Sequence, residues 1–236
     1  MQDKQGNGRC KFVSFSGIDG AGKSTQIANL RARLQEADLR VALVTFWDDV
    51  ARLKRIREGA GHTLFKGEKG VGSPEKPVNR RDKNVRSWPM SLVRLGLYFV
   101  DALSLRAAVA KALRSGADFV ICDRYIYDEL ANLNLGNPAA RSYVRMIMKL
   151  VPRPDVSYFL DADPIAARAR KPEYPLDFLY ISRASYFTLI ELIGGITVIS
   201  PMSIQDAERE VMRHALALLS SEELQNQPAE HLVSER

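Results

Sequence analysis

The segment from Gly17 to Ser24 contains the residues whose types and spacing most clearly suggest chemistry. It reads Gly-Ile-Asp-Gly-Ala-Gly-Lys-Ser, which fits the pattern G-x-x-x-x-G-K-[ST] at every required position. Glycines let such a loop curl until successive backbone N–H groups point at one anion, and the helix that follows adds partial positive charge. Lys23 can then reach the β- and γ-phosphates of a nucleotide, and the Ser24 hydroxyl can bind Mg²⁺. The expected phosphate-binding set is Gly17, Gly20, Ala21, Gly22, Lys23 and Ser24.

Two acidic residues and one arginine could complete such a site. Asp123 directly follows an apolar run and can face a metal or a substrate, while Arg124 can grip an anion through two nitrogens. Asp19 lies inside the loop, where a carboxylate is costly beside phosphates unless it serves a metal, a water or an acceptor group. The alternatives are a surface salt bridge at a strand end and an aspartate that stabilises a turn.

A basic cluster consists of Arg168, Arg170 and Lys171. Phosphoryl transfer needs cations over the moving phosphoryl group, because negative charge spreads onto its equatorial oxygens. A basic segment that closes on the nucleotide would supply them and exclude water. The alternative is a solvated helix end whose charges favour the helix dipole.

The elements that must position these residues follow from hydrophobic patterning. Short apolar runs predict buried strands, and they alternate with segments of helical periodicity. The strands are expected at 12–15, 41–46, 119–122, 156–160 and 197–199, and the main helices at 24–37, 91–115, 141–150, 164–170, 176–192 and 204–219. This order predicts one doubly wound parallel α/β domain, with ligands at the carboxyl ends of the strands. A Gly-rich turn without a ligand is the alternative for the loop, and the strand before it and the helix after it favour phosphate binding.

Composition sets the outer limits. The chain has 236 residues, a net charge of +6 and two cysteines, Cys10 and Cys122. We expect a single domain over 1–236 with a core of about 11–219, a basic loop excursion at 59–89 and a polar tail at 221–236. The positive charge favours anionic partners. We see no signal peptide and no apolar stretch of the roughly 20 residues that a membrane helix needs, so the cytoplasm is the expected compartment.

Three segments together resemble the thymidylate kinase family of nucleoside monophosphate kinases. They are Phe15-Ser-Gly-Ile-Asp-Gly-Ala-Gly-Lys-Ser-Thr25, Asp123-Arg-Tyr125 and Pro154-Asp-Val-Ser-Tyr-Phe-Leu-Asp-Ala-Asp-Pro164, the last of which precedes the basic cluster. The resemblance extends from about Lys11 to Leu219 and is poor between Trp47 and Pro89.

The resemblance implies a P-loop NTPase fold with five parallel strands, and ATP and Mg²⁺ as co-substrates. It implies a nucleoside monophosphate as the phosphate acceptor, with thymidylate as the first candidate. It implies that Lys23, Ser24 and Thr25 bind ATP and Mg²⁺, that Asp123 lies near the metal and that Asp19 faces the acceptor. Arg124 would hold the acceptor's phosphate, and Arg168 and Arg170 would be lid cations. Because the family is often dimeric, a homodimer is a further expectation, whereas nucleic acid and membranes are not expected as partners.

The chain departs from the family pattern on the acceptor side. Phe46-Trp-Asp-Asp49 stands where the family has Arg-Glu-Pro, Asp101 stands where an arginine contacts the acceptor, and Asp128 follows Asp123-Arg-Tyr125 where small polar residues are usual. Arg94 or Arg106 would be the substitute for the missing arginine. Two alternatives therefore stay open: a kinase of the same fold with a different acceptor, and a nucleotide-binding switch with little turnover.

Two further features have open interpretations. Trp47 follows a predicted strand and could stack on a base or pack on the domain. The stretch 66–86 holds seven basic and three acidic residues, and could contact a polyanion or be a solvated loop.

Overall fold

The computed structural model describes residues 9–50 and 88–225 and contains one sheet of five parallel strands in the order β2-β3-β1-β4-β5. The strands are β1 (Lys11–Ser16), β2 (Val41–Thr45), β3 (Phe119–Asp123), β4 (Val156–Leu160) and β5 (Ile196–Ile199). β1 is the central strand and pairs with β3 on one side and with β4 on the other, so the strand order reverses direction at β1. The crevice beyond the carboxyl end of β1 is therefore the place where this kind of sheet binds ligands.

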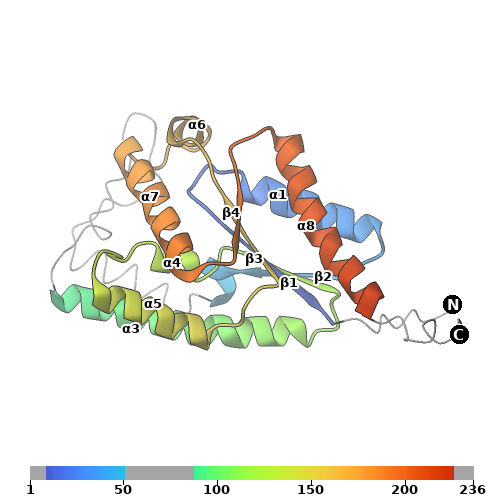
Figure 1. Ribbon diagram of the computed structural model, residues 1–236, viewed down its shortest axis with the longest axis horizontal. Coiled ribbons are helices and arrows are strands. Elements are labelled where there is room, and N and C mark those ends of the chain that lie inside the picture. The colour runs from blue at the N-terminus through green and yellow to red at the C-terminus, as the bar shows by residue number, and fades with distance from the viewer. Residues whose placement is uncertain (1–8, 51–87, 226–236) are drawn as a thin grey trace, which may run out of the picture.

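Helices cover both faces of the sheet (Figure 1). They are α1 (Lys23–Glu36), α3 (Trp88–Leu113), α4 (Tyr127–Leu130), α5 (Pro138–Leu150), α6 (Pro164–Arg170), α7 (Leu176–Ile193) and α8 (Ile204–Gln225). Alternate strand residues point to opposite faces. Phe12 accordingly packs in the core that α3, α5 and α7 close, and Val13 packs in the core beneath α1 and α8.

The predicted fold class is confirmed, and several boundaries are corrected. The second strand ends at Thr45, because the Asp49 carboxylate accepts a hydrogen bond from the Thr45 N–H at 2.7 Å and Phe46–Val50 form a π-helical turn. The helix expected at 141–150 begins at Pro138, because the Asn137 side chain caps it.

The predicted excursion and tail are also corrected at their edges. The excursion at 59–89 was expected to reach Pro89, but α3 already begins at Trp88, and the rest of the excursion lies outside the described residues, as does the helix candidate at 51–57. The tail was expected from residue 221, whereas α8 continues to Gln225. Across the described ranges, no helix is long and apolar enough to cross a membrane.

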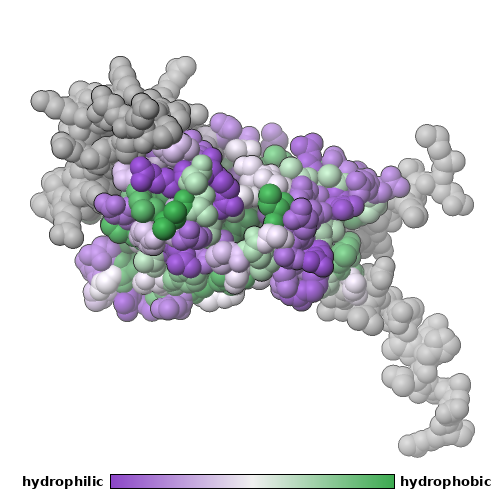
Figure 2. Space-filling view, turned by 90° about the horizontal axis from the view of Figure 1, so that it is seen from above, coloured by the Kyte–Doolittle hydropathy of each residue, from purple (hydrophilic) through white to green (hydrophobic). Residues whose placement is uncertain are grey.

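Seen from above, over α6, α7 and α8, hydrophobic side chains lie in small groups among hydrophilic ones (Figure 2). The exposed apolar residues in these helices include Ile165, Tyr180, Ile181, Ile204 and Leu216. Scattered exposed apolar residues are normal on a protein surface.

Candidate active site

The phosphate loop leaves the carboxyl end of β1 and runs into α1, and its glycines permit close contacts with the neighbouring strand and helix. A Cβ added to Gly17 would lie 2.5 Å from the carbonyl oxygen of Leu160, at the end of β4. Gly20 has φ +82, and a Cβ there would lie well within 3.0 Å of the carbonyl oxygen of Ala167 in α6. Only glycine therefore lets the loop pack against both segments.

Lys23 is buried at the start of α1, and its ammonium group donates to two carbonyls of the loop. The Nζ–O distances are 2.8 Å to Gly17 and 2.9 Å to Ile18. Burial, followed by repulsion from Arg124, lowers the pKa of Lys23 to about 8. A bound phosphate would favour the charged form of Lys23, because an opposite charge at short range stabilises an ammonium group. Lys23 is therefore positioned to bind an anion in the loop.

Side chains whose oxygens could bind a metal lie on both sides of the loop. Ser24 and Thr25 are exposed in the first turn of α1, and Asp123 ends β3 in register with Phe15 of β1, two residues before the loop. Burial is the main cause that raises the pKa of Asp123, against attraction to Arg124 and Lys23. Mg²⁺ is usually held by one or two protein oxygens together with phosphates and waters. A hydroxyl and a carboxylate beside a phosphate loop fit that requirement.

In 9–50 and 88–225, no group of three or more His, Cys, Asp and Glu side chains could hold a metal ion. Mg²⁺ bound with a nucleotide usually takes part of its ligands from the phosphates and from water.

Arg124 lies between two carboxylates next to the loop. Its Nη2 donates to Asp19, and its Nη1 donates to Asp128 Oδ1 at 3.0 Å. Its backbone has φ +66, a conformation that is uncommon for a residue with a side chain, and its N–H donates to the Phe15 carbonyl at 3.0 Å. Burial alone would lower the pKa of Arg124, but Asp128 and Asp19 together raise it. The guanidinium is charged and directed to the loop.

Asp19 is shared between Arg124 and a lysine of the basic cluster. Burial would raise the pKa of Asp19, but the charges of Arg124, Lys23 and Lys171 together lower it. Lys171 Nζ lies 4.0 Å from Asp19 Oδ1 and 3.3 Å from Glu173 Oε1. Asp19 is therefore ionised and surrounded by cations.

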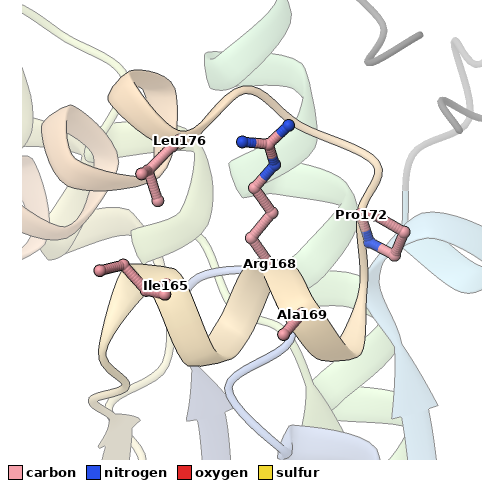
Figure 3. Close-up of a pocket in the computed structure, with 5 residues that line it drawn as sticks. All are labelled: Ile165, Arg168, Ala169, Pro172 and Leu176. Carbon is pink, nitrogen blue, oxygen red and sulfur yellow. The ribbon is translucent and has the colours of Figure 1, made fainter. Parts of the chain in front are cut away.

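The helix α6 carries Arg168 and Arg170, and Lys171 follows its last residue. Asp163 caps the start of α6, because its carboxylate accepts from the Ala166 N–H at 3.0 Å. Arg168 points into a pocket of about 360 Å³ between α6 and the start of α7, which Ile165, Ala169, Pro172 and Leu176 also line (Figure 3). Arg170 is exposed. Neither arginine forms an ion pair with another described residue, and Lys171 is the member of the cluster that reaches the loop.

The structure also places the residues that depart from the family pattern. Asp128 is buried beside Arg124, Asp101 is buried in α3, and Trp47 is exposed with its ring edge against Phe46. Arg106 donates to the carbonyl of Leu150 at 3.0 Å. That carbonyl ends α5, before β4 begins, so Arg106 lies near the amino ends of the parallel strands, whereas the loop lies at their carboxyl ends. Arg106 is therefore excluded as the substitute arginine.

Sequence reasoning missed two parts of the site. It singled out Asp128 only as a departure and did not predict that Ser16 Oγ donates to its Oδ2 at 2.6 Å. It also missed the pairing of Asp161 with Arg183, whose Nε and Nη2 donate to the two carboxylate oxygens at 2.6 Å each. The signal for Asp161 was its place at a strand end, but its partner lies 22 residues later in α7.

Comparison with known proteins gives relatives that match most of the chain. No protein-family model matches it. The chain is 31% identical over 189 residues to a probable thymidylate kinase of Staphylothermus marinus, covering 76% of this chain and 81% of that protein. It is 28% identical over 169 residues to a thymidylate kinase of Prochlorococcus marinus, covering 70% and 73%, respectively.

A solved structure agrees in fold. The crystal structure of thymidylate kinase from Ehrlichia chaffeensis is similar with a TM-score of 0.58 and 19% sequence identity, covering 89% of this chain and 99% of that one. Identity at this level supports the fold alone, whereas the Staphylothermus relative is similar in sequence over most of both chains. The chain belongs to the thymidylate kinase family.

Proposed function

We propose that the protein transfers the γ-phosphoryl group of ATP to thymidylate, so that dTMP and ATP give dTDP and ADP. The observation that carries the proposal is the position of Arg124, which follows β3 and contacts Asp19 of the phosphate loop. An arginine at that place can hold a second phosphate beside the one that the loop binds. Two phosphates side by side are what transfer to a monophosphate requires, and the curated relatives are named thymidylate kinases.

On the donor side, the backbone N–H groups of Gly20, Ala21 and Gly22 surround the phosphates of ATP, and Lys23 moves from the Gly17 and Ile18 carbonyls to the phosphate oxygens. Ser24 and Asp123 would hold Mg²⁺, and Thr25 is exposed beside Ser24. The metal supplies neutralisation of the charge on the phosphates.

On the acceptor side, Arg124 holds the phosphate of dTMP, and an oxygen of that phosphate attacks the γ-phosphorus. A new P–O bond forms while the bond to the β–γ bridging oxygen breaks, which leaves ADP. Asp19, next to Arg124, helps to orient the acceptor. Arg168, Arg170 and Lys171 supply cations if α6 moves over the nucleotide, because charge grows on the transferring oxygens.

A second candidate is a kinase of the same fold with a different acceptor. The specific observation in its favour is Asp128, a carboxylate that accepts a hydrogen bond from Arg124. A carboxylate on this arginine competes with a phosphate for the same cation.

ATP consumption by the purified protein, measured against dTMP, other nucleoside monophosphates, nucleosides and sugars, separates these candidates. The proposal predicts the highest kcat/KM with dTMP. Turnover with another acceptor but not with dTMP would support the second candidate. ATP binding without transfer to any acceptor would support a nucleotide-binding switch and would contradict both kinase proposals.

We infer that the protein forms a homodimer through α3. Exposed large apolar side chains lie along this helix, namely Leu92, Val93, Phe99, Val100 and Leu103. A groove of about 630 Å³ between β2 and α3 adds apolar lining from Leu43. Exposed apolar patches of this kind are typical of interaction surfaces. Sedimentation velocity would show a dimer if the inference is right and a monomer at all concentrations if it is wrong.

A further inference from the structure

Asp128 is a buried carboxylate that contacts several groups of the acceptor side at once. Its Oδ2 accepts from Ser16 Oγ at 2.6 Å and lies 3.4 Å from the Tyr125 N–H, and its Oδ1 accepts from Arg124. Tyr186 of α7 packs nearby, and the pKa of its hydroxyl is raised first by burial and then by the charge of Asp128. Donors from β1 and from the segment after β3 therefore fix this carboxylate in one orientation.

The two carboxylates that pair with Arg124 differ in the energetic cost of breaking their ion pair. The Asp128 side chain is 4% exposed, whereas that of Asp19 is 17% exposed and lies in the glycine-rich loop. Asp19 also has a second cation, Lys171, within 4.0 Å. Separating Arg124 from Asp128 would leave a buried charge without its cation, and that is far more costly than exchanging the partner of a more accessible group.

The backbone of Arg124 makes such an anchor necessary. A non-glycine residue at φ +66 is held there only when its surroundings over-determine it. The hydrogen bond from the Arg124 N–H to the Phe15 carbonyl fixes the backbone. The hydrogen bond from Arg124 Nη1 to Asp128 fixes the far end of the side chain. The other terminal nitrogen of the guanidinium, Nη2, donates to Asp19 and is the one that can change its partner.

We propose that Asp128 is a positioning residue that holds Arg124 through Nη1, while Nη2 exchanges Asp19 for the phosphate of the acceptor. The inference rests on the proposed function and adds to it a residue that acts through Arg124. Asp128 acts through Arg124 and does not contact the reacting atoms. Its presence pre-orients the arginine, so that less ordering is needed when the acceptor binds.

A double-mutant cycle of Asp128→Asn and Arg124→Ala tests this inference. Asn keeps the size of the side chain and removes its charge. In the unmodified background, we expect Asp128→Asn to lower kcat/KM for dTMP about tenfold or more, since small misplacements of a substrate-holding group are costly. The KM for ATP should change less than about twofold, because the phosphate loop is untouched.

In the Arg124→Ala background, Asp128→Asn should change kcat/KM for dTMP less than about twofold, since the residue through which it acts is gone. Equal losses in both backgrounds, or an equal rise of both KM values, would overturn the inference and indicate a purely structural role. Asp118→Asn is the matched control, because Asp118 pairs with Arg40 at 3.1 Å just before β3 and β2 begin, at the amino ends of the strands. We expect it to leave turnover unchanged.

A measurement without turnover keeps the inference separate from the proposed function. If the unmodified protein does not phosphorylate dTMP, the proposed function fails, and NMR of the arginine side chains still tests Asp128. We expect slow rotation and separate Nη signals for Arg124 in the ligand-free protein, and averaged signals in Asp128→Asn. Averaged Arg124 signals in the unmodified protein would overturn the inference even if dTMP is a good substrate.

Discussion

The donor and acceptor sides of the site are built in different ways. The donor side is a contiguous loop in which Lys23 donates to carbonyls five and six residues earlier. The acceptor side is assembled from distant segments, since Arg124 contacts Asp19 across 105 residues and Ser16 contacts Asp128 across 112. Backbone and local spacing thus define the nucleotide end, whereas side chains and tertiary packing define the acceptor end. Changes to the chain can therefore alter the acceptor without disturbing ATP.

The largest expected effect comes from Lys23→Ala on the donor side. Removal of the ammonium group should lower kcat by about 1,000-fold or more, because it takes away charge stabilisation that grows in the transition state. Steady-state ATP consumption with dTMP measures this. Circular dichroism should show an intact fold, and retained activity in a folded variant would contradict the role of the loop.

Arg124→Ala should break the acceptor side more than the donor side. We expect kcat/KM for dTMP to fall about 100-fold while the KM for ATP changes little, because in the proposed function the guanidinium holds the acceptor's phosphate. Initial rates with each substrate varied in turn give both values. Equal changes in the two KM values would show that the two sides are not separable. Because the change also leaves Asp128 without its cation, the melting temperature should be measured in parallel.

Gly20→Ala tests the contact between the loop and α6. The new Cβ would collide with the Ala167 carbonyl at a residue with φ +82, so we expect a loss of about 1–3 kcal/mol in unfolding free energy and weaker ATP binding. Urea unfolding and ATP titration measure the two effects. Gly96→Ala is the control, since a Cβ at Gly96 in α3 meets no atom within 4 Å. It should be neutral or stabilise the helix. A Gly20 variant as stable as this control would contradict the close contact.

The smallest expected effect is a pH dependence of the donor side. The pKa of Lys23 is lowered to about 8, so the protein holds fewer protons than the unfolded chain between this value and the usual lysine pKa. Stability should therefore rise with pH in that window, and ATP binding should take up about half a proton near pH 8. Calorimetry in buffers of different ionisation enthalpy measures the uptake. No change in uptake between about pH 7 and pH 9 would contradict the assigned state of Lys23.

The limits of sequence prediction follow the same division. The five strands and the phosphate loop were predictable, because apolar runs and the loop pattern are local. The short helix α4 and the bonds of Asp128 were not, because they depend on contacts between β1, the end of β3 and α7. The basic cluster was clear from its composition, but its division was not. Lys171 reaches Asp19 while Arg168 faces the pocket, and this depends on how α6 packs against the loop, where Ala167 lies close to Gly20.

The most direct test of the account is identification of the products when the purified protein is incubated with ATP, Mg²⁺ and dTMP. The account predicts equal amounts of ADP and dTDP, with dTDP formed far more slowly by Arg124→Ala and at the unmodified rate by Asp118→Asn. ADP without dTDP, or no conversion with dTMP and rapid conversion with another acceptor, would contradict it.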